Sequence, residues 1–409
     1  MKIGILTWDL ALRGGTQRQI VELARELKRA GDTVVIYAIY YDPEVYPDIL
    51  EGIPIRYFFS GNKLARGINE RKIFGIYFRA LPLLFEEWRL SSRIAAWVDA
   101  ELDILNPHDN HVFQAAAEWR RQTKKPVVWM MNDFPTIVLP ATRFRSRLLN
   151  SLYDHLNGKL RIRSWYERSI REMDRIVVLD DGISRKYLEE QFGIHPVTIR
   201  SGLDISKFTY TPRRPFVGDR SLEILSTGIF FPHRRLEDIV EAIRILKNRG
   251  QELTWRHVGS GELHPEYEKT IRRHVDSAGI SSVCIFLGRI SDAELVRLYQ
   301  SADIFLFPND PQTWGLAVFE AMACGTPVVV SKGAGASEVL TDGIDSLLID
   351  PCRPDQLAAA IKRLASSPDE WLRLSLTGRK FVEENITWPI YASNMRRVMA
   401  RCHENSDRA

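Results

Sequence analysis

The sequence predicts an α/β protein built from two doubly wound domains with parallel sheets. Its 409 residues are too many for one ordinary hydrophobic core and fit two domains of roughly 200 residues each. In both halves, short apolar runs alternate with segments of helical periodicity, which is the pattern of strands covered by helices. Between the halves, the polar and proline-punctuated stretch 209–219 is the best linker candidate.

The composition is that of an ordinary globular chain without low-complexity tracts. The longest apolar runs fall far short of the roughly 20 residues that a membrane span needs, and the N-terminal MKIGILTWDL reads as a first strand rather than a signal peptide. We therefore expect a cytoplasmic protein. Its four cysteines, Cys284, Cys324, Cys352 and Cys402, lack metal-like spacing, so we expect reduced thiols and no metal site.

The chain begins with a predicted βαβ unit, in which strands over 2–9 and 34–38 flank a helix. Gly14, Gly15 and Thr16 lie at the first strand-to-helix turn. Glycines there let the backbone approach a ligand closely, and the amides of Gly15 and Thr16 could face a phosphate or a sugar. The same pair also suits a plain tight turn, and both readings stay open.

Two further predicted strands, over 102–106 and 127–131, end in polar side chains: His108 and Asp109 after the first, Asn132 and Asp133 after the second. Ligand-binding residues of α/β proteins gather at the carboxyl ends of strands, which makes these four side chains candidates for catalysis. Such residues can instead cap helices or form turns, and a lone histidine can be a core residue.

Residues 57–97 mix aromatic and basic side chains, and a second basic stretch covers 143–163. At helical spacing, the first segment presents an apolar face made of Ile73, Ile76, Tyr77, Leu81 and Leu84. This pattern is typical of a helix with one buried face in a soluble domain, and also of a helix on an anionic membrane surface.

The second half is predicted to repeat the alternation, with strands over 222–227, 255–259 and 283–288 and a helix over 237–248. The loop after the first of these strands runs from Gly228 to Arg235 and is rich in bases.

The stretch 304–331 carries the strongest signal. A strand over 304–307 leads through a turn-rich loop to Gly315, which opens a helix that contains Glu320, and a buried strand follows over 328–330. The free amides and the dipole of such a helix favour an anion such as a diphosphate, while Glu320 can accept hydrogen bonds from sugar hydroxyls. The combination suggests a nucleotide-sugar pocket.

Gln312-x7-Glu320, followed by AMACGTPVV over 321–329, resembles the signature of the retaining, GT-B-fold glycosyltransferases of family 4, the group 1 glycosyl transferases. The usual E-x7-E is Q-x7-E here. The resemblance implies two Rossmann-like domains facing across a cleft. Residues 1–208 would bind the acceptor, 220–385 would bind the donor, and a helix in 386–409 would cross back to the first domain.

The resemblance also implies roles for particular residues. Glu320 would hold the ribose, and Gln312 would contact the donor sugar. The diphosphate would meet Arg234 and backbone groups, and the base would be held mainly by the backbone at Gly288 to Ile290. The donor-binding set is therefore Gly14, Gly15, Thr16, Gly228, Arg234, Arg235, Gly288, Ile290, Gln312, Gly315, Leu316 and Glu320.

Two more departures bear on mechanism. Ile229 stands where the family has the first base of its R-x4-K pair, and Asn132 stands where many members have a histidine. Because an amide cannot take a proton at neutral pH, no acid–base role transfers to Asn132. In this family the leaving phosphate is thought to take the acceptor proton, and neither a metal nor a cofactor is required.

We therefore expect retaining transfer of a sugar from a nucleotide diphosphate sugar to a glycan or lipid-linked acceptor, with no nucleic-acid partner. Residues 1–215 carry a net charge of +7 and residues 216–409 one of −3, so the acceptor half is basic and could contact the anionic inner face of the cell membrane. One alternative is a nucleotide-sugar epimerase, which would need acids and no acceptor site. Another is a non-catalytic nucleotide-sugar-binding protein, favoured by the departures at Gln312, Ile229 and Asn132.

Overall fold

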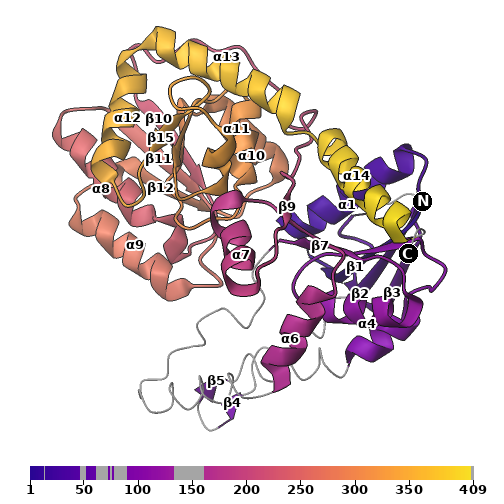
Figure 1. Ribbon diagram of the computed structural model, residues 1–409. Helices are drawn as coiled ribbons and strands as arrows, with labels where there is room; N and C mark the ends of the chain where they lie inside the picture. Colours follow the sequence, from indigo (N-terminus) through magenta and orange to yellow (C-terminus); the bar gives the residue numbers. More distant parts are fainter. Residues whose placement is uncertain are drawn as a thin grey trace. The chain divides into compact units, whose positions relative to one another are not determined.

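The computed structural model describes residues 1–12, 14–46, 52–60, 72–73, 76–77, 90–132 and 161–406. They form two compact units (Figure 1). Unit 1 comprises Met1–Arg200 and Trp388–Ala409, and unit 2 comprises Ser201–Thr387.

Unit 1 is built on parallel strands, with the first strand of the chain in the middle. The strands are β1 (Lys2–Leu10), β2 (Thr33–Tyr41), β3 (Ile55–Ser60), β6 (Ile104–Pro107), β7 (Val128–Met131), β8 (Arg175–Val178) and β9 (Val197–Thr198). Their order is β3-β2-β1-β6 in one sheet and β7-β8-β9 in another. A parallel bridge between His108 and Met130 joins the two sheets edge to edge, so that the strand ends of β1, β6 and β7 are neighbours.

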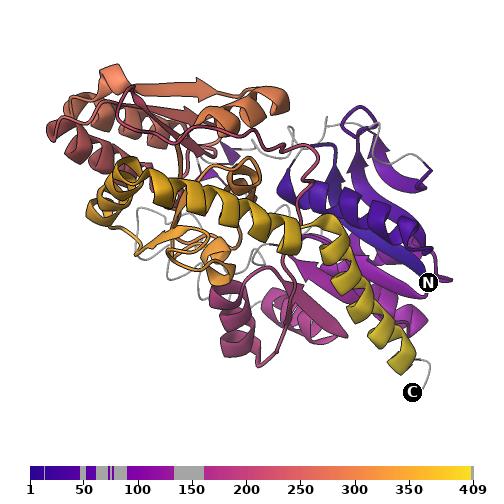
Figure 2. The same cartoon turned by 90° about the horizontal axis from the view of Figure 1, so that it is seen from above.

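Helices pack on this sheet. They are α1 (Gly15–Arg29), α4 (Phe113–Thr123), α6 (Arg161–Arg171), the π-helical turn η1 (Asp181–Arg185), α7 (Lys186–Phe192) and α14 (Trp388–Ser406). Helix α14 ends the chain but lies beside α1 at its beginning (Figures 1 and 2). On α4, Phe113 stacks on Trp129 of β7 with ring centroids 4.5 Å apart, and both side chains are fully buried. Such an aromatic pair adds about 0.5–1.5 kcal/mol to the stabilisation from its buried area.

Unit 2 is a single six-stranded parallel sheet with the order β12-β11-β10-β13-β14-β15. The strands are β10 (Leu222–Thr227), β11 (Leu253–Val258), β12 (Cys284–Gly288), β13 (Ile304–Phe307), β14 (Val328–Ser331) and β15 (Leu347–Ile349). The chain winds outward from β10 to β12 and then returns to β13 on the other side of β10. This reversal creates a topological switch point between β10 and β13.

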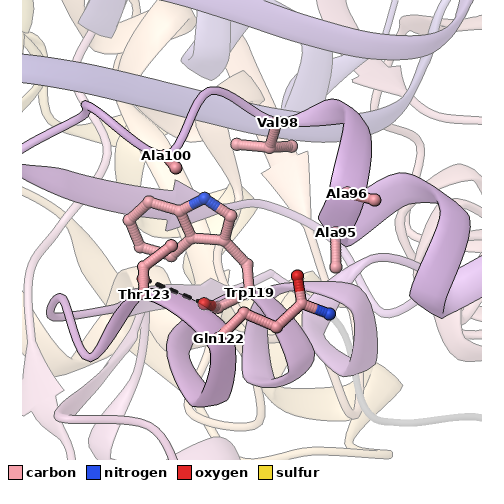
Figure 3. A pocket seen from close by; sticks show the side chains of 7 residues that line it. All are labelled: Ala95, Ala96, Val98, Ala100, Trp119, Gln122 and Thr123. Carbon is pink, nitrogen blue, oxygen red and sulfur yellow. Dashed lines mark hydrogen bonds between the residues drawn. The ribbon is translucent and has the colours of Figure 1, made fainter.

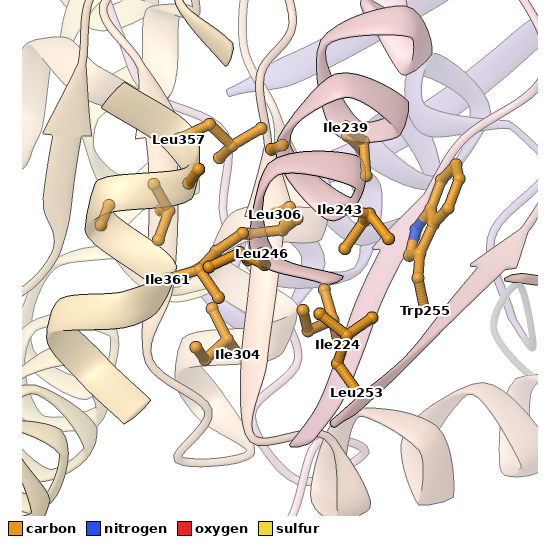
Figure 4. Packing of buried hydrophobic residues seen from close by; sticks show 14 of the residues in the cluster. Ile224, Ile239, Ile243, Leu246, Leu253, Trp255, Ile304, Leu306, Leu357 and Ile361 are labelled. Carbon is orange, nitrogen blue, oxygen red and sulfur yellow. The ribbon is translucent and has the colours of Figure 1, made fainter. Parts of the chain in front are cut away.

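The helices of unit 2 are α8 (Leu236–Asn248), α9 (Pro265–Ser277), α10 (Asp292–Ser301), α11 (Leu316–Ala323), α12 (Pro354–Ser366) and α13 (Pro368–Asn385), with 3-10 turns η2 (Pro232–Arg234), η3 (Ser281–Val283) and η4 (Gly335–Val339). Figure 4 shows the core that holds α8 and α12 on the sheet. Ile224 and Ile304 are paired residues of β10 and β13, and Ile243 of α8 and Ile361 of α12 pack over them. Each such fully buried side chain stabilises the fold by about 1.5–3 kcal/mol.

The boundary between the units falls earlier than expected, at Arg200 and Ser201, and the linker candidate 209–219 belongs to unit 2. Side chains explain the difference. The guanidinium of Arg213 donates to the carbonyl oxygen of Ala302 and lies 5.2 Å over the ring of Trp371. Proline and charge in this stretch therefore mark an irregular segment that packs on unit 2 rather than a free linker.

Two local predictions are wrong. The helical face through Ile73, Ile76 and Tyr77 is replaced by two short antiparallel strands, β4 (Lys72–Ile73) and β5 (Ile76–Tyr77), while Leu81, Leu84 and the basic residues 143–160 lie outside the described residues. Residues 333–338 also read in the sequence as the start of a helix, but only the 3-10 turn η4 forms there. Among the described residues, no helix combines the length and apolar character that crossing a bilayer requires.

Candidate functional site

The predicted donor residues of unit 2 gather at the switch point of its sheet. The loops after β10 and β13 meet there, because the amide of Asp310 donates a hydrogen bond to the carbonyl oxygen of His233 at 2.8 Å. Crevices at the carboxyl ends of strands on either side of such a point are where open α/β sheets bind ligands.

Three glycines line the ends of β10, β11 and β12. The amide of Gly228 donates to the carbonyl oxygen of Val258, and the amide of Gly259 donates to that of Gly288. A Cβ atom on Gly259 would lie 1.9 Å from the carbonyl oxygen of Gly228, so only glycine permits this approach. The result is a flat backbone surface that contains two predicted donor residues, Gly228 and Gly288, and Ile290 lies half-buried just beyond it.

Arg234 lies directly on this surface. A Cβ atom on Gly228 would lie 3.1 Å from its Nε, and that nitrogen is buried without a hydrogen-bond partner. Desolvation lowers the pKa of the guanidinium, and no acid of the described chain forms an ion pair with it. A half-buried cation without a counterion is costly, and a bound anion would compensate it.

The neighbouring Arg235 differs from Arg234. Its guanidinium donates to both carboxylate oxygens of Asp238, at 3.0 and 2.9 Å, and pairs with Glu237 at 3.0 Å. These acids neutralise its charge locally, so the geometry favours Arg234 over Arg235 as the cation for a diphosphate.

The amino end of α11 follows the loop after β13, at the same end of the sheet. Gly315, the residue before the helix, has φ of 150°, and a Cβ atom there would lie 2.8 Å from the ring of Phe307. Glycine is therefore required for the chain to enter the helix at this angle. At the start of α11 the amide of Val318 donates to the carbonyl oxygen of Gly315 at 3.0 Å, so the amides of Leu316 and Ala317 are the ones in this turn that can bind an anion.

Glu320 is half-buried in the second turn of α11, and its Oε2 accepts a hydrogen bond from the hydroxyl of Tyr299 at 2.9 Å. Gln312 is held by its backbone, because its amide donates to Gly333 and its carbonyl oxygen accepts from Gly335. The side chains of Gln312 and Asn309 keep buried polar atoms, Oε1 and Nδ2, without a partner. A bound ligand or a water molecule would satisfy such groups.

In unit 1, Gly14 precedes α1 in an extended conformation, and Gly14, Gly15 and Thr16 form an amino end without a side-chain cap. A Cβ atom on Gly15 would meet nothing within 4 Å, so the backbone is open at Gly15, whereas a Cβ atom on Gly14 would lie 2.4 Å from Oε1 of Gln17. This is the geometry that the anion-binding reading requires, although it also suits the plain turn.

Asp109 ties the end of β1 to the loop after β6. Its carboxylate accepts hydrogen bonds from the Thr7 hydroxyl at 3.0 Å, the Trp8 amide at 2.8 Å and the His111 amide at 2.9 Å. Desolvation raises its pKa to about 6, although these donors and the charge of His111 oppose the shift. The contacts describe a carboxylate that organises the strand ends.

His108 is a core histidine. Its side chain is fully buried, its Nε2 is 2.9 Å from Oδ1 of Asn106, and desolvation lowers its pKa to about 3. The ring is therefore neutral at physiological pH and out of reach of solvent, which does not support the expected catalytic role. Asn132 is 6% exposed and has a buried Nδ2 without a partner, and Asp133 lies outside the described residues.

A row of aromatic rings at the same strand ends was not anticipated from the sequence. Phe59 of β3 stacks on Tyr40 of β2 at 5.3 Å, Tyr40 meets Trp8 of β1 at 5.8 Å, and Trp8 meets His111 at 5.6 Å. The four residues are far apart in sequence, so only the parallel register brings them together. Phe59 is 36% exposed, which leaves part of the row open to solvent.

A hollow of about 310 Å³ lies elsewhere in unit 1, between residues 95–100 and the last turn of α4 (Figure 3). It is lined by Ala95, Ala96, Val98, Ala100, Trp119, Gln122 and Thr123. Because α4 runs from the end of β6 back to the start of β7, its last turn is at the edge of the sheet opposite the strand ends. We assign the hollow no part in the site.

Comparisons with known proteins bear on both units. The model for glycosyltransferase family 4 matches residues 13–207, and the model for glycosyl transferases group 1 matches residues 212–381. Two solved structures share the fold over 98% of this chain. One is Anabaena HepE in complex with UDP, with a TM-score of 0.72, 16% sequence identity and 100% of that chain covered. The other is sucrose-phosphate synthase from Thermosynechococcus elongatus, with a TM-score of 0.73, 19% sequence identity and 99% of that chain covered.

Two of the relatives that come from mycobacteria show the extent of the similarity. The GDP-mannose-dependent α-(1-6)-phosphatidylinositol dimannoside mannosyltransferase of Mycobacterium tuberculosis is 29% identical over 57% of this chain, and the match spans only 61% of that protein. The phosphatidyl-myo-inositol mannosyltransferase of Mycobacterium leprae is 24% identical over 97% of this chain and 96% of its own length. Since the two family models together account for both units, the chain belongs to the family 4, group 1 glycosyltransferases, whose fold is GT-B.

Proposed function

We propose that the protein transfers a sugar from a nucleotide diphosphate sugar to an acceptor hydroxyl with retention of configuration. The observation that carries the proposal is the guanidinium of Arg234, half-buried on Gly228 and without an acidic partner in the described chain. Few ligands other than a phosphate-bearing one would suit this cation, whose loop is hydrogen-bonded to the loop that leads to α11.

The diphosphate then becomes the leaving group. Arg234 and the amides at Gly315 and Leu316 stabilise the negative charge that grows on it, as an oxyanion hole does. In unit 1, the amides at Gly14, Gly15 and Thr16 are proposed to bind a phosphate or a sugar. Glu320 accepts hydrogen bonds from the ribose, and Gln312 contacts hydroxyls of the donor sugar. With charge stabilisation from these groups, we propose no metal and no cofactor.

GDP-mannose is the donor that we propose to test first, because the name of a relative in Mycobacterium tuberculosis specifies it. The fold neighbour HepE was crystallised with UDP, which makes UDP-sugars the second choice. The base would lie against the backbone at Gly288 to Ile290, where side chains contribute little discrimination.

We propose that the acceptor is a lipid-linked glycan or polyol, since relatives act on phosphatidylinositol mannosides. The +7 charge of residues 1–215 would attract an anionic membrane face, and the aromatic row from Phe59 to His111 offers apolar ring faces to a sugar or inositol ring. The proposed site of action is the cytoplasmic face of the membrane.

The experiment offers the protein GDP-mannose, UDP-glucose and ADP-glucose, with and without vesicles that contain phosphatidylinositol. Nucleotide released only in the presence of acceptor, with an α-linked product by NMR, supports the proposal. An epimerised donor would identify the epimerase alternative, and binding without turnover of any donor would identify a binding protein. Vesicle sedimentation at low and high salt tests the membrane contact, which indifference to anionic lipid would exclude.

A further inference from the structure

We propose that Tyr299 is a positioning residue, which fixes the carboxylate of Glu320 for the ribose of the nucleotide. The inference rests on the proposed function and goes beyond it. The hydroxyl of Tyr299, on α10, donates to Oε2 of Glu320, on α11, at 2.9 Å. A hydrogen bond to a carboxylate is stronger than one between neutral groups, so it can hold the rotamer of the acid.

Tyr299 is itself immobilised. Its side chain is fully buried, and its ring meets Phe305 at 5.5 Å and Phe208 at 6.2 Å. The carbonyl oxygen of Tyr299 accepts a hydrogen bond from the hydroxyl of Thr326, just before β14. A ring packed on both sides, with its backbone tied to the next strand, presents its hydroxyl at one fixed point.

The hydroxyl also reaches the other side of the switch point. The Oγ1 atom of Thr227, the last residue of β10, is 3.4 Å from it. Burial raises the pKa of Tyr299 well above its usual value, and the negative charge of Glu320 raises it further. The phenol therefore stays protonated and acts as the donor to Glu320. A short chain of hydrogen bonds thus connects the end of β10, which carries the Gly228 loop, to the acid on α11.

The test removes only the hydroxyl, in Tyr299→Phe. Affinities are measured by calorimetry for GDP and UDP, for their 2′,3′-dideoxy analogues and for inorganic pyrophosphate. We expect the variant to bind GDP or UDP, whichever the wild type binds more tightly, about tenfold more weakly. This is the scale of one hydrogen bond to a charged group. The ratio of the affinity for the ribonucleotide to the affinity for its dideoxy analogue should fall toward one, while the affinity for pyrophosphate stays unchanged.

A matched control exists in the same unit. The hydroxyl of Tyr267, on α9, donates to Oε2 of Glu237, on α8, at 2.5 Å. Tyr267→Phe removes the same kind of bond away from α10 and α11. We expect it to lower the melting temperature by a similar amount and to leave the ratio between ribonucleotide and dideoxy analogue as in the wild type.

If Tyr299→Phe loses affinity equally for the nucleotide, the dideoxy analogue and pyrophosphate, Tyr299 has a merely structural role and the inference is overturned. Wild-type protein that binds none of these nucleotides would instead overturn the proposed function. If Tyr299→Phe does not fold, Thr227→Val weakens the same chain from its other end. It should reduce the ratio by about twofold, as the loss of a weaker hydrogen bond would, and an unchanged ratio would again contradict the inference.

Discussion

Arg234 packs its side chain over Gly228, so closely that a Cβ atom on the glycine would lie 3.1 Å from Nε and 3.3 Å from Cζ of the arginine. The glycine has φ of 141°, a conformation that L-residues rarely adopt. In this loop, Gly228 forms part of the backbone surface and Arg234 places a cation on it. A charge held in this way, with no ion-pair partner among the residues that the structure describes, is preorganised for an anion.

Arg234→Ala should lower kcat/KM for sugar transfer at least about 30-fold, because the charge on the leaving diphosphate loses its cation. This fall corresponds to a rise of about 2 kcal/mol in the activation free energy. Arg235→Ala is the matched control. Since Asp238 and Glu237 already neutralise Arg235, we expect its loss to change transfer by less than about threefold. Steady-state kinetics with a saturating acceptor distinguish the two variants. Equal effects of the two substitutions would refute the assignment of the diphosphate site.

Glu320→Gln keeps the size of the side chain and removes its negative charge. We expect the activation free energy derived from kcat/KM to rise by about 2 kcal/mol, since a neutral amide accepts hydrogen bonds from ribose hydroxyls less strongly than a carboxylate does. The fold should persist, because the amide oxygen can still accept from Tyr299. Circular dichroism and a thermal melt check the folding, and a rate equal to that of the wild type would exclude Glu320 from the site.

The sequence predicts regular elements best where local signals agree with packing. The strand over 304–307 and the helix after Gly315 are confirmed because an apolar run, a glycine and a helical repeat all indicate the same boundaries. The prediction is wrong at 72–73 and 76–77, where Lys72 pairs with Tyr77 and Ile73 pairs with Ile76 in a short antiparallel ladder. Over so few residues, periods of 2 and 3.6 cannot be told apart.

The candidate site could be predicted only in part. Gly228, Arg234, Gly315 and Glu320 follow strand ends in sequence, so their convergence follows from the fold class. Tyr299 could not be found, because a tyrosine on the inner face of an amphipathic helix looks like any core residue. What distinguishes it is its contact with Glu320, which lies 21 residues further along the chain. The burial of His108 could not be predicted either, since it follows from the placement of this residue between β1 and β7: its amide donates to the carbonyl oxygen of Leu6, and it forms a bridge with Met130.

Asp109 should make stability depend on pH in an identifiable way. Its pKa is raised to about 6 in the folded protein against 3.8 for the ordinary group, chiefly because burial disfavours the charged form. The folded state therefore holds the proton more tightly, and this contribution to stability is present below pH 3.8 and lost as pH rises through 6.

Asp109→Asn removes this titration, and Asn tolerates the φ of 65° at this position. We expect the free energy of unfolding of the variant, relative to wild type, to increase between pH 4 and pH 6.5 and to level off above about pH 7. Urea unfolding at several pH values measures this difference, in which groups common to both proteins cancel. A difference that does not vary with pH would show that Asp109 titrates normally.

Arg396 connects the last helix of unit 1 to its first residues. Its guanidinium donates to Asp32 at 2.6 Å, and the N-terminal amine donates to the same carboxylate at 2.9 Å. Burial by itself raises the pKa of Asp32, but these two partners outweigh it and hold the pKa below its usual value. Stability from the cluster is therefore present above the unfolded pKa, near 3.8, and lost as pH falls below it.

Arg396→Ala should lower the free energy of unfolding by about 1–3 kcal/mol at neutral pH, because the Asp32 carboxylate, only 1% exposed, loses a charged donor. The neighbouring Arg397, which is exposed on α14, provides the control, and its replacement by alanine should cost less than about 0.5 kcal/mol. The difference between the two variants should shrink as pH falls through 4, since protonated Asp32 no longer needs the cation. An equal effect of both substitutions at pH 7 would mean that α14 is held by its apolar contacts with α1 alone.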